Sequence, residues 1–267
     1  MNSAPVGIFD SGIGGLTVAR AIYGRLPRES TLYFGDTARV PYGPKSPETV
    51  RRYSLEILRW LLGRGVKAVV VACNTSTAHA LDALREASPV PVIGVIEPGA
   101  GAGVAAAGPG PIGVIGTAGT IASNAYARAI HALDPSLTVA QKACPLFVPL
   151  VEEGWFAHPA TELVAAEYLA PLQTAGVRAL VLGCTHYPLL RPLLQRTMGA
   201  DVALIDSGEA TAEALARVLA AGGLEAPAVG APPTHHFAVS DDAARFLAVG
   251  ARFIGARLTA AEVVPLG

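Results

Sequence analysis

The chain has 267 residues and a formal net charge of −1, with 51% apolar and only 15% charged residues, a composition that excludes a disordered chain. The absence of a basic run argues against nucleic acid or an acidic membrane as partner, and no apolar stretch approaches the roughly 18–20 residues of a membrane span. A strand pattern begins almost at once, which leaves no room for a signal peptide. We therefore expect a compact cytoplasmic protein.

Short apolar runs alternate with helical stretches along the chain. The predicted strands are Gly7–Phe9, Thr31–Phe34, Ala68–Ala72, Val92–Val95, Ile112–Ile115, Leu180–Leu182 and Ala203–Ile205. The predicted helices include Thr49–Arg64, Ala78–Ala87 and Ala160–Ala175, with a helix and turn over 99–110. From Ser207 the chain is expected to be helical and then to return, through a short strand-like segment, to the first half. Strands that are apolar throughout are typical of parallel sheets covered on both faces, so we predict an α/β fold.

Two segments of the first half recur in the second. Pro5–Ser11 resembles Pro111–Thr117, and Val69–Thr75 resembles Ala179–Thr185, in the same order and at similar offsets. This favours a duplicated α/β unit, with chance likeness between apolar strands as the alternative. Because ligands bind beyond the carboxyl ends of parallel strands, a duplication would bring one cysteine from each unit to a shared cleft.

Cys73 and Cys184 each follow a predicted buried strand directly, and polar residues follow both. Three cysteines in a cytoplasmic chain do not make a disulfide framework. A thiol at a helix N-terminus has a lowered pKa, so both residues are predicted to be reactive; the alternative is a small apolar residue at a strand–helix junction. Cys144 has no polar cluster beside it and is interpreted as structural.

Two ionisable residues accompany these thiols. His186 lies two residues after Cys184 and could exchange a proton with it, polarise a carboxylate, or simply be satisfied by backbone at a helix start. Asp10 ends the first strand, before a glycine-rich turn that could bring N–H groups to an anion. A structural Asp10 that caps the next helix is the alternative.

Other polar residues have two readings each. The loop Gly35–Gly43 is dense in polar groups, but its Asp36 and Arg39 are equally explained as a local ion pair. Glu152 and Glu153 are either site carboxylates or a solvated helix start, and Thr117 and Thr120 either bond a carboxylate or cap a helix.

Cofactor and metal signals are missing from the sequence. None of the three lysines, Lys45, Lys67 and Lys142, lies in an obvious pyridoxal pocket. Without a Cys-x-x-Cys pair or a histidine cluster, no metal site is predicted.

Together these segments resemble the glutamate racemase family, within the wider aspartate/glutamate racemase group. The matching segments are Gly7–Leu16, Gly35–Gly43, Ala72–Thr75, Gly94–Pro98 and Gly183–Leu189, with Ile205–Gly208 extending the match. His186 is the residue of glutamate-type members, whereas aspartate-type members usually carry a glutamate there.

The resemblance implies two α/β domains related by pseudo-twofold symmetry, at 1–96 plus 208–267 and at 97–207, with the active site between them. It implies cofactor-independent racemisation, in which the residue at Cys73 takes the α-proton from D-glutamate and the residue at Cys184 takes it from L-glutamate. Asp10 and His186 would assist these thiols and contact the substrate. The other expected substrate-binding residues are Ser11, Tyr42, Gly43, Asn74, Thr75 and Thr185, with Glu152, Thr117 and Thr120 in a second tier.

The expected partner is a small molecule, D- or L-glutamate, and the product D-glutamate would supply peptidoglycan synthesis. A homodimer is expected. Three other functions stay open: an aspartate racemase of the same fold, a protein that only binds an acidic amino acid, and a thiol hydrolase that uses Cys184 and His186.

Overall fold

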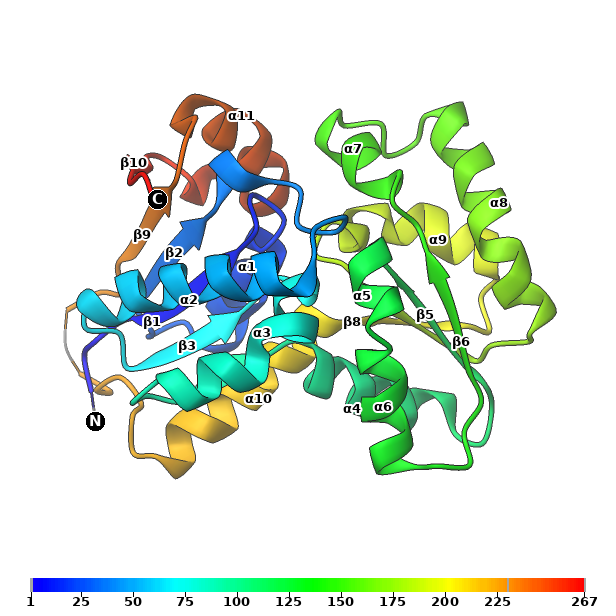
Figure 1. Cartoon of the computed structure of the whole chain (residues 1–267), viewed down its shortest axis with the longest axis horizontal. Coiled ribbons are helices and arrows are strands. Elements are labelled where there is room, and N and C mark those ends of the chain that lie inside the picture. The colour runs from blue at the N-terminus through cyan, green and yellow to red at the C-terminus, as the bar shows by residue number, and fades with distance from the viewer. Residues whose placement is uncertain (1, 230, 267) are drawn as a thin grey trace.

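The computed structural model describes residues 2–229 and 231–266, and over these residues two parallel β-sheets form the framework (Figure 1). The six-stranded sheet has the order β10-β9-β2-β1-β3-β4, and the four-stranded sheet has the order β6-β5-β7-β8. The strands are β1 (Val6–Asp10), β2 (Thr31–Gly35), β3 (Ala68–Val71), β4 (Val92–Gly94), β5 (Ile112–Gly116), β6 (Val139–Ala143), β7 (Ala179–Gly183), β8 (Ala203–Asp206), β9 (His235–Val239) and β10 (Glu262–Val263).

Helices pack around both sheets (Figure 1). They are α1 (Leu16–Arg25), α2 (Pro47–Gly63), α3 (Asn74–Ala87), α4 (Ile96–Ala107), α5 (Ala118–Ala122), α6 (Ala125–Leu133), α7 (Phe147–Glu152), α8 (Pro159–Thr174), α9 (Arg191–Met198), α10 (Ser207–Ala221) and α11 (Ala243–Ile254), with 3₁₀ turns at Thr37–Arg39, Tyr187–Leu190 and Gly255–Arg257. Within the described ranges no helix combines the length and apolar character needed to cross a membrane.

The predicted α/β fold with parallel sheets is confirmed. Each predicted strand is present within a residue or two of its expected bounds, and the strands β1, β2, β3, β5 and β7 are buried along their whole length. Every strand pair in the described residues is parallel. Burial on both faces explains why these strands are apolar throughout.

The two sheets repeat the same strand order. β2-β1-β3-β4 in the first sheet corresponds to β6-β5-β7-β8 in the second. The register agrees as well, because Val6 pairs with Ala68 in the first sheet and Ile112 pairs with Ala179 in the second. Cys73 and Cys184 therefore follow equivalent strands, β3 and β7, at the carboxyl edge of each sheet, which supports a duplicated unit.

The end of the chain returns to the first sheet, as predicted. β9 pairs with β2, and β10 pairs with β9, so the orange and red segments lie beside the blue ones in Figure 1. The strands of the first sheet all fall within 1–96 or 208–267, and those of the second within 97–207. The domain boundaries themselves stay a prediction.

Some predicted elements were misplaced or missed. The helix predicted at Ala78–Ala87 begins at Asn74, because the Cys73 sulfur itself caps it by accepting the Ser76 N–H at 3.4 Å. The strands β6 and β9 were not predicted. β6 contains Gln141 and Lys142 and is only partly buried at the edge of its sheet, and β9 begins with two histidines, so neither strand is apolar throughout.

One of the scarce lysines has a structural role far from any thiol. Lys67 Nζ lies 2.5 Å from Glu29 Oε2, with both side chains buried, and donates to the carbonyl of Asn2 at 2.7 Å. The other oxygen of Glu29 accepts the N–H of Ala226 at 2.7 Å. This buried pair connects the N-terminal segment to the chain that follows α10.

Replacement of Lys67 by methionine is expected to lower the free energy of unfolding by about 3–5 kcal/mol, because it leaves the Glu29 carboxylate buried without a counter-charge. Urea unfolding measures the change. The double variant Lys67→Met/Glu29→Gln should recover most of the loss, since it removes both charges. A single variant within about 1 kcal/mol of the wild type would show that the pair contributes no more than a surface salt bridge.

Candidate active site

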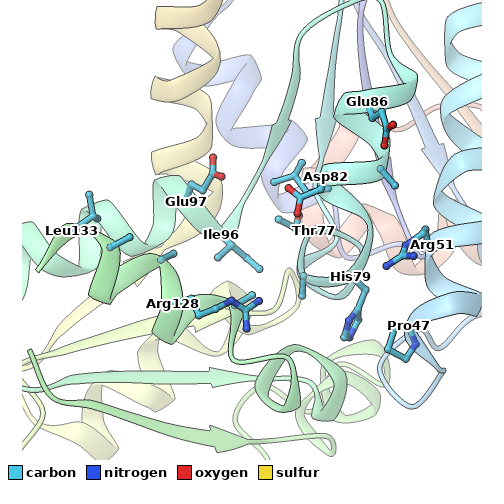
Figure 2. Close-up of a pocket in the computed structure, with 16 residues that line it drawn as sticks. Pro47, Arg51, Thr77, His79, Asp82, Glu86, Ile96, Glu97, Arg128 and Leu133 are labelled. Carbon is cyan, nitrogen blue, oxygen red and sulfur yellow. The ribbon is translucent and has the colours of Figure 1, made fainter. Parts of the chain in front are cut away.

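Several hollows lie where elements of the two sheets meet. One of them, about 770 Å³, is lined by side chains of α2, α3, α4 and α6, among them Arg51, His79 and Arg128 (Figure 2). Neither cysteine of interest lines it. A smaller cavity of about 70 Å³ is lined by both Cys73 and Cys184, so the chemistry points to the smaller one.

The small cavity collects most of the residues singled out in the sequence. From the first half of the chain come Ser11, Gly12, Ile13, Val40, Pro41, Tyr42, Gly43, Cys73, Asn74 and Thr75, and from the second half come Thr117, Val148, Glu152, Cys184, Thr185 and His186. Asp10 and Thr120 do not line the cavity but contact residues that do, Gly12 and Thr117 respectively. Ile13, Val40 and Pro41 belong to recognised motifs but are apolar, and Val148 has no signal in the sequence, so these were missed.

Cys73 lies at the junction of β3 and α3, next to Asp10 at the end of β1. Burial and the Asp10 charge raise the pKa of Cys73 to about 11, against the opposing effect of hydrogen bonds from Ser76. The predicted lowering of this thiol's pKa by the helix N-terminus is therefore wrong. One N–H at 3.4 Å does not compensate for removal of the thiolate from water.

Asp10 is itself almost fully buried. Burial raises the pKa of its carboxyl group, although the charge of His186 and the backbone N–H groups of the following turn act in the opposite direction. Its Oδ2 accepts the N–H of Gly12 at 2.9 Å. Among the described residues, Oδ1 has no hydrogen-bond partner, which leaves one acceptor beside the cavity unsatisfied.

Cys184 has a different partner. Its sulfur lies 4.0 Å from His186 Nδ1, and the other ring nitrogen, Nε2, lies 3.1 Å from Glu152 Oε1. Burial alone would lower the pKa of His186, but its contacts with Cys184 and Glu152 outweigh this effect and raise the pKa to about 10. The ring is therefore positively charged at neutral pH.

Glu152 connects His186 to the C-terminal helix. Burial acts to raise the pKa of Glu152, but His186 and Arg245 hold it below its usual value. Arg245 Nη2 lies 3.3 Å from Glu152 Oε2, and Arg252 donates to the Glu152 carbonyl. Both arginines belong to α11, so the first sheet's own helix contacts the carboxylate beside the second thiol.

The glycine-rich turn after Asp10 packs directly against the second motif. A Cβ atom on Gly14 would lie 2.2 Å from Thr185 Oγ1 and 2.4 Å from His186 Nδ1, so only glycine fits there. Thr17 Oγ1 donates to the Thr185 carbonyl at 2.9 Å. The glycine therefore permits close approach of the two halves of the site.

Three threonine hydroxyls meet across the cavity. Thr75 Oγ1 lies 2.9 Å from Thr117 Oγ1 and 3.3 Å from Thr120 Oγ1, and Thr117 and Thr120 are 3.0 Å apart. Thr117 also caps α5, so the cap role considered for it is confirmed. Because a hydroxyl can rotate, this cluster can turn its donors toward a carboxylate.

Asn74 offers a further donor. Its Oδ1 accepts the Tyr126 hydroxyl at 2.8 Å, and over the described part of the chain its buried Nδ2 has no partner. Such a fixed amide is suited to binding an oxygen of a ligand carboxylate.

Tyr42 and Gly43 close one wall of the cavity. The Tyr42 hydroxyl donates to Asp36, so that hydroxyl is already engaged. The Gly43 carbonyl accepts the Gly119 N–H at 2.9 Å, which ties this loop to α5 of the other unit.

Cys144 and Glu153, like Asp36 and Arg39, do not line the cavity. Cys144 is buried, its sulfur lies 3.6 Å from the Lys142 carbonyl, and its own carbonyl accepts the Tyr187 hydroxyl, in keeping with a structural role. Glu153 is exposed, and only Glu152 of the adjacent pair lines the cavity.

Comparison with known proteins places this geometry in context. The family model described as Asp/Glu/Hydantoin racemase matches residues 17–215. A glutamate racemase of Geobacter metallireducens is 54% identical over 95% of this chain and 93% of its own length. The solved structure of glutamate racemase isoform RacE1 from Bacillus anthracis has a TM-score of 0.94 at 40% identity and covers 100% of this chain and 98% of its own. A glutamate racemase from Francisella tularensis, solved with D-glutamate, has a TM-score of 0.92 at 38% identity over 99% and 98%.

Proposed function

The chain belongs to the Asp/Glu/hydantoin racemase family, and from this premise we propose that it interconverts L- and D-glutamate without a cofactor. Cys73 and Cys184 act as the two bases, one on each face of the substrate Cα. The observation that carries the proposal is a small cavity lined by one thiol from each repeated unit, each with its own ionisable neighbour.

Glutamate is the preferred substrate for two reasons. Relatives about half identical over nearly the whole chain are glutamate racemases, and one solved relative holds D-glutamate. The motif histidine, His186, is also the residue that glutamate-type members carry after the second cysteine. An aspartate racemase is the nearest alternative.

Inversion of a stereocentre requires two bases. A single base would return the proton to the face that it left. A base on one face and an acid on the other invert the centre in one turnover. The two groups must start in opposite protonation states. At neutral pH Cys73 is a thiol, because burial and Asp10 raise its pKa to about 11, and the charged His186 stabilises negative charge on Cys184.

In the L-to-D direction, the Cys184 thiolate removes the α-proton and the Cys73 thiol delivers its proton to the opposite face. The thiolate and thiol are then exchanged, and the enzyme is ready for the D-to-L direction. Asp10 is placed to take part with Cys73, and His186 with Cys184. In this assignment, Asp10 assists proton removal from D-glutamate and His186 assists proton removal from L-glutamate.

The carbanion intermediate needs strong electrostatic stabilisation, because the α-proton of an amino acid is very weakly acidic. We assign this to preorganised donors around the substrate carboxylates: the free Asn74 amide, the threonine cluster, and groups of Ser11, Gly43 and Thr185. The unsatisfied Oδ1 of Asp10 suits the substrate ammonium group. Exclusion of water from so small a cavity strengthens each of these interactions.

Three further points belong to the proposal. No lysine lines the cavity over the described residues, and Lys67 is engaged by Glu29, which favours chemistry without a pyridoxal Schiff base.

We also propose that the enzyme acts in the cytoplasm as a homodimer. Its D-glutamate would supply peptidoglycan synthesis and so contribute to cell shape.

Exchange of the α-proton with solvent deuterium tests the proposed function. The purified chain, with no added cofactor, should place deuterium at Cα of both glutamate enantiomers, as followed by proton NMR, while circular dichroism follows loss of optical activity. A protein that only binds glutamate would exchange nothing.

Parallel reactions with D- and L-aspartate provide the control. Equal or faster turnover of aspartate would contradict the choice of glutamate. Exchange that requires added pyridoxal phosphate would contradict the cofactor-independent mechanism.

A further inference from the structure

Asp36, which directly follows β2, is a motif residue that the proposed chemistry does not use. Its side chain is fully buried and accepts hydrogen bonds on both oxygens. Arg39 Nε, at 2.7 Å, and the Tyr42 hydroxyl donate to Oδ2, and the Ser240 hydroxyl donates to Oδ1 at 2.8 Å. The local ion pair considered for Asp36 and Arg39 is confirmed, but it is only one part of this cluster.

The three donors come from two separate parts of the chain. Arg39 and Tyr42 belong to the loop itself, whereas Ser240 follows β9 in the C-terminal part of the chain and also accepts the Ala38 N–H at 2.8 Å. Arg39 continues the network, because its guanidinium binds Glu56 of α2 and lies 4.0 Å from the centre of the Tyr53 ring. The loop 37–43 is therefore held at β2, β9 and α2 together.

This loop forms one wall of the cavity. Val40, Pro41, Tyr42 and Gly43 all line it. Its inner side also packs closely on the turn after Asp10, since a Cβ atom on Gly12 would lie 2.8 Å from Val40 Cγ1. Through the Gly43 carbonyl it meets the N–H of Gly119 in the other unit at 2.9 Å. The position of this wall thus depends on groups that never reach the cavity.

We propose that Asp36 is a positioning residue, which sets the place of the substrate-binding wall Val40–Gly43 through the Tyr42 hydroxyl and Arg39. The inference rests on the proposed racemase function. Its physical basis is that both oxygens of a carboxylate accept hydrogen bonds, so Asp36 can bind donors on both sides. An asparagine would offer one acceptor and an NH₂ group, which would face a donor on one side of the cluster.

Loss of this anchor affects binding more than chemistry. Asp36 does not line the cavity, and the two thiols keep their own neighbours, Asp10 and His186, when Asp36 is changed. A displaced wall weakens binding of the substrate and of the transition state by the same amount, which raises KM and leaves kcat nearly unchanged. The change in kcat/KM must be the same for both enantiomers, because they have equal free energy in solution.

Steady-state kinetics of Asp36→Asn tests the proposal with both enantiomers. We expect KM to rise about tenfold or more, as loss of a buried charged hydrogen bond allows, with kcat within about threefold of the wild type. Ser240→Ala removes one donor from the far side of the cluster and should raise KM in the same direction by a smaller factor. Hydrogen exchange over 36–43 should be faster in both variants.

Lys67→Met is the matched control, because it breaks another buried ion pair in the same half of the chain, away from the cavity. It should lose stability and keep the wild-type KM. If its KM rises as in Asp36→Asn, or if KM in Asp36→Asn stays within about twofold of the wild type, the positioning role is overturned.

Ser240→Ala decides the question if Asp36→Asn does not fold. A raised KM in this variant supports the positioning role, and an unchanged KM overturns it. A wild-type chain that fails to exchange the α-proton of glutamate overturns the proposed function, whereas an active wild type with unaffected variants overturns only this inference.

Discussion

Serine in place of either Cys73 or Cys184 is expected to lower the rate of glutamate racemisation by about 10³-fold or more, near the upper end of what one general acid or base contributes. A serine hydroxyl is far less acidic than a thiol and does not exchange a proton with Cα at a useful rate. Each variant keeps one competent thiol, but inversion needs two. Circular dichroism at saturating L- or D-glutamate measures the loss.

The two variants should differ in one respect that racemisation cannot reveal. Because the enantiomers have equal free energy, any change must lower kcat/KM equally in both directions. Elimination of chloride from 3-chloroglutamate needs only removal of the α-proton, followed by departure of chloride from Cβ, so it reports each base alone. Cys73→Ser should eliminate only from the L-series, through Cys184, and Cys184→Ser only from the D-series, through Cys73.

The third cysteine provides a control for this experiment. Cys144 is buried outside the cavity, so Cys144→Ser should racemise glutamate within about threefold of the wild type, as expected of a change that removes no transition-state contact. Racemisation by Cys73→Ser or Cys184→Ser at a near-normal rate would refute the two-base mechanism. Elimination from both series by one variant would refute the assignment of the two faces.

Glutamine in place of Glu152 is expected to give the second largest loss of activity, about 10²-fold in kcat/KM at neutral pH. The carboxylate of Glu152 lies 3.1 Å from His186 Nε2 and helps to raise the pKa of that ring to about 10. Without this charge, only the contact with Cys184 opposes burial, so the pKa of His186 falls and the ring holds its proton less firmly. Negative charge on Cys184 is then less well stabilised, so elimination from L-3-chloroglutamate should fall while elimination from the D-enantiomer is largely kept.

The same variant should change how stability depends on pH. A histidine whose pKa is about 10 in the folded chain and near 6.5 when unfolded stabilises the fold fully below pH 6.5, and this contribution is lost as the pH rises toward 10. The wild type should therefore lose free energy of unfolding between about pH 6.5 and 9, and Glu152→Gln should lose less. Urea unfolding at several pH values measures both slopes.

Glu153→Gln is the matched control, because its side chain is exposed and does not line the cavity. It should keep both the wild-type activity and the wild-type pH dependence. If Glu152→Gln also kept the wild-type activity and pH dependence, the raised pKa of His186 would be due to Cys184 alone, and the role of Glu152 would be refuted.

Much of the fold could be predicted because the signal is local. Runs such as Val69–Val71 and Leu180–Leu182 are apolar throughout, as parallel strands buried on both faces must be, and each was placed within a residue or two. β6 and β9 were missed because neither strand is apolar throughout: β6 contains Gln141 and Lys142 at the edge of its sheet, and β9 begins with two histidines. The start of α3 was misplaced since a cysteine, rather than one of the polar residues after it, caps that helix.

Most of the reactive residues of the site could be recognised from local sequence. Cys73 and Cys184 each directly follow an apolar strand run. Asp10 ends such a run, and His186 lies two residues after Cys184, so a short stretch of sequence is enough to single out each residue. The charge state of these groups, and which of them are in contact, could be known only from the folded chain. Glu152 rather than Glu153 binds His186, Ser240 meets Asp36 across the chain, and Cys73 has a raised rather than a lowered pKa. The physical reason is that burial and charge depend on everything packed around a group, including residues far along the chain, whereas strand and turn patterns depend on the few residues beside it.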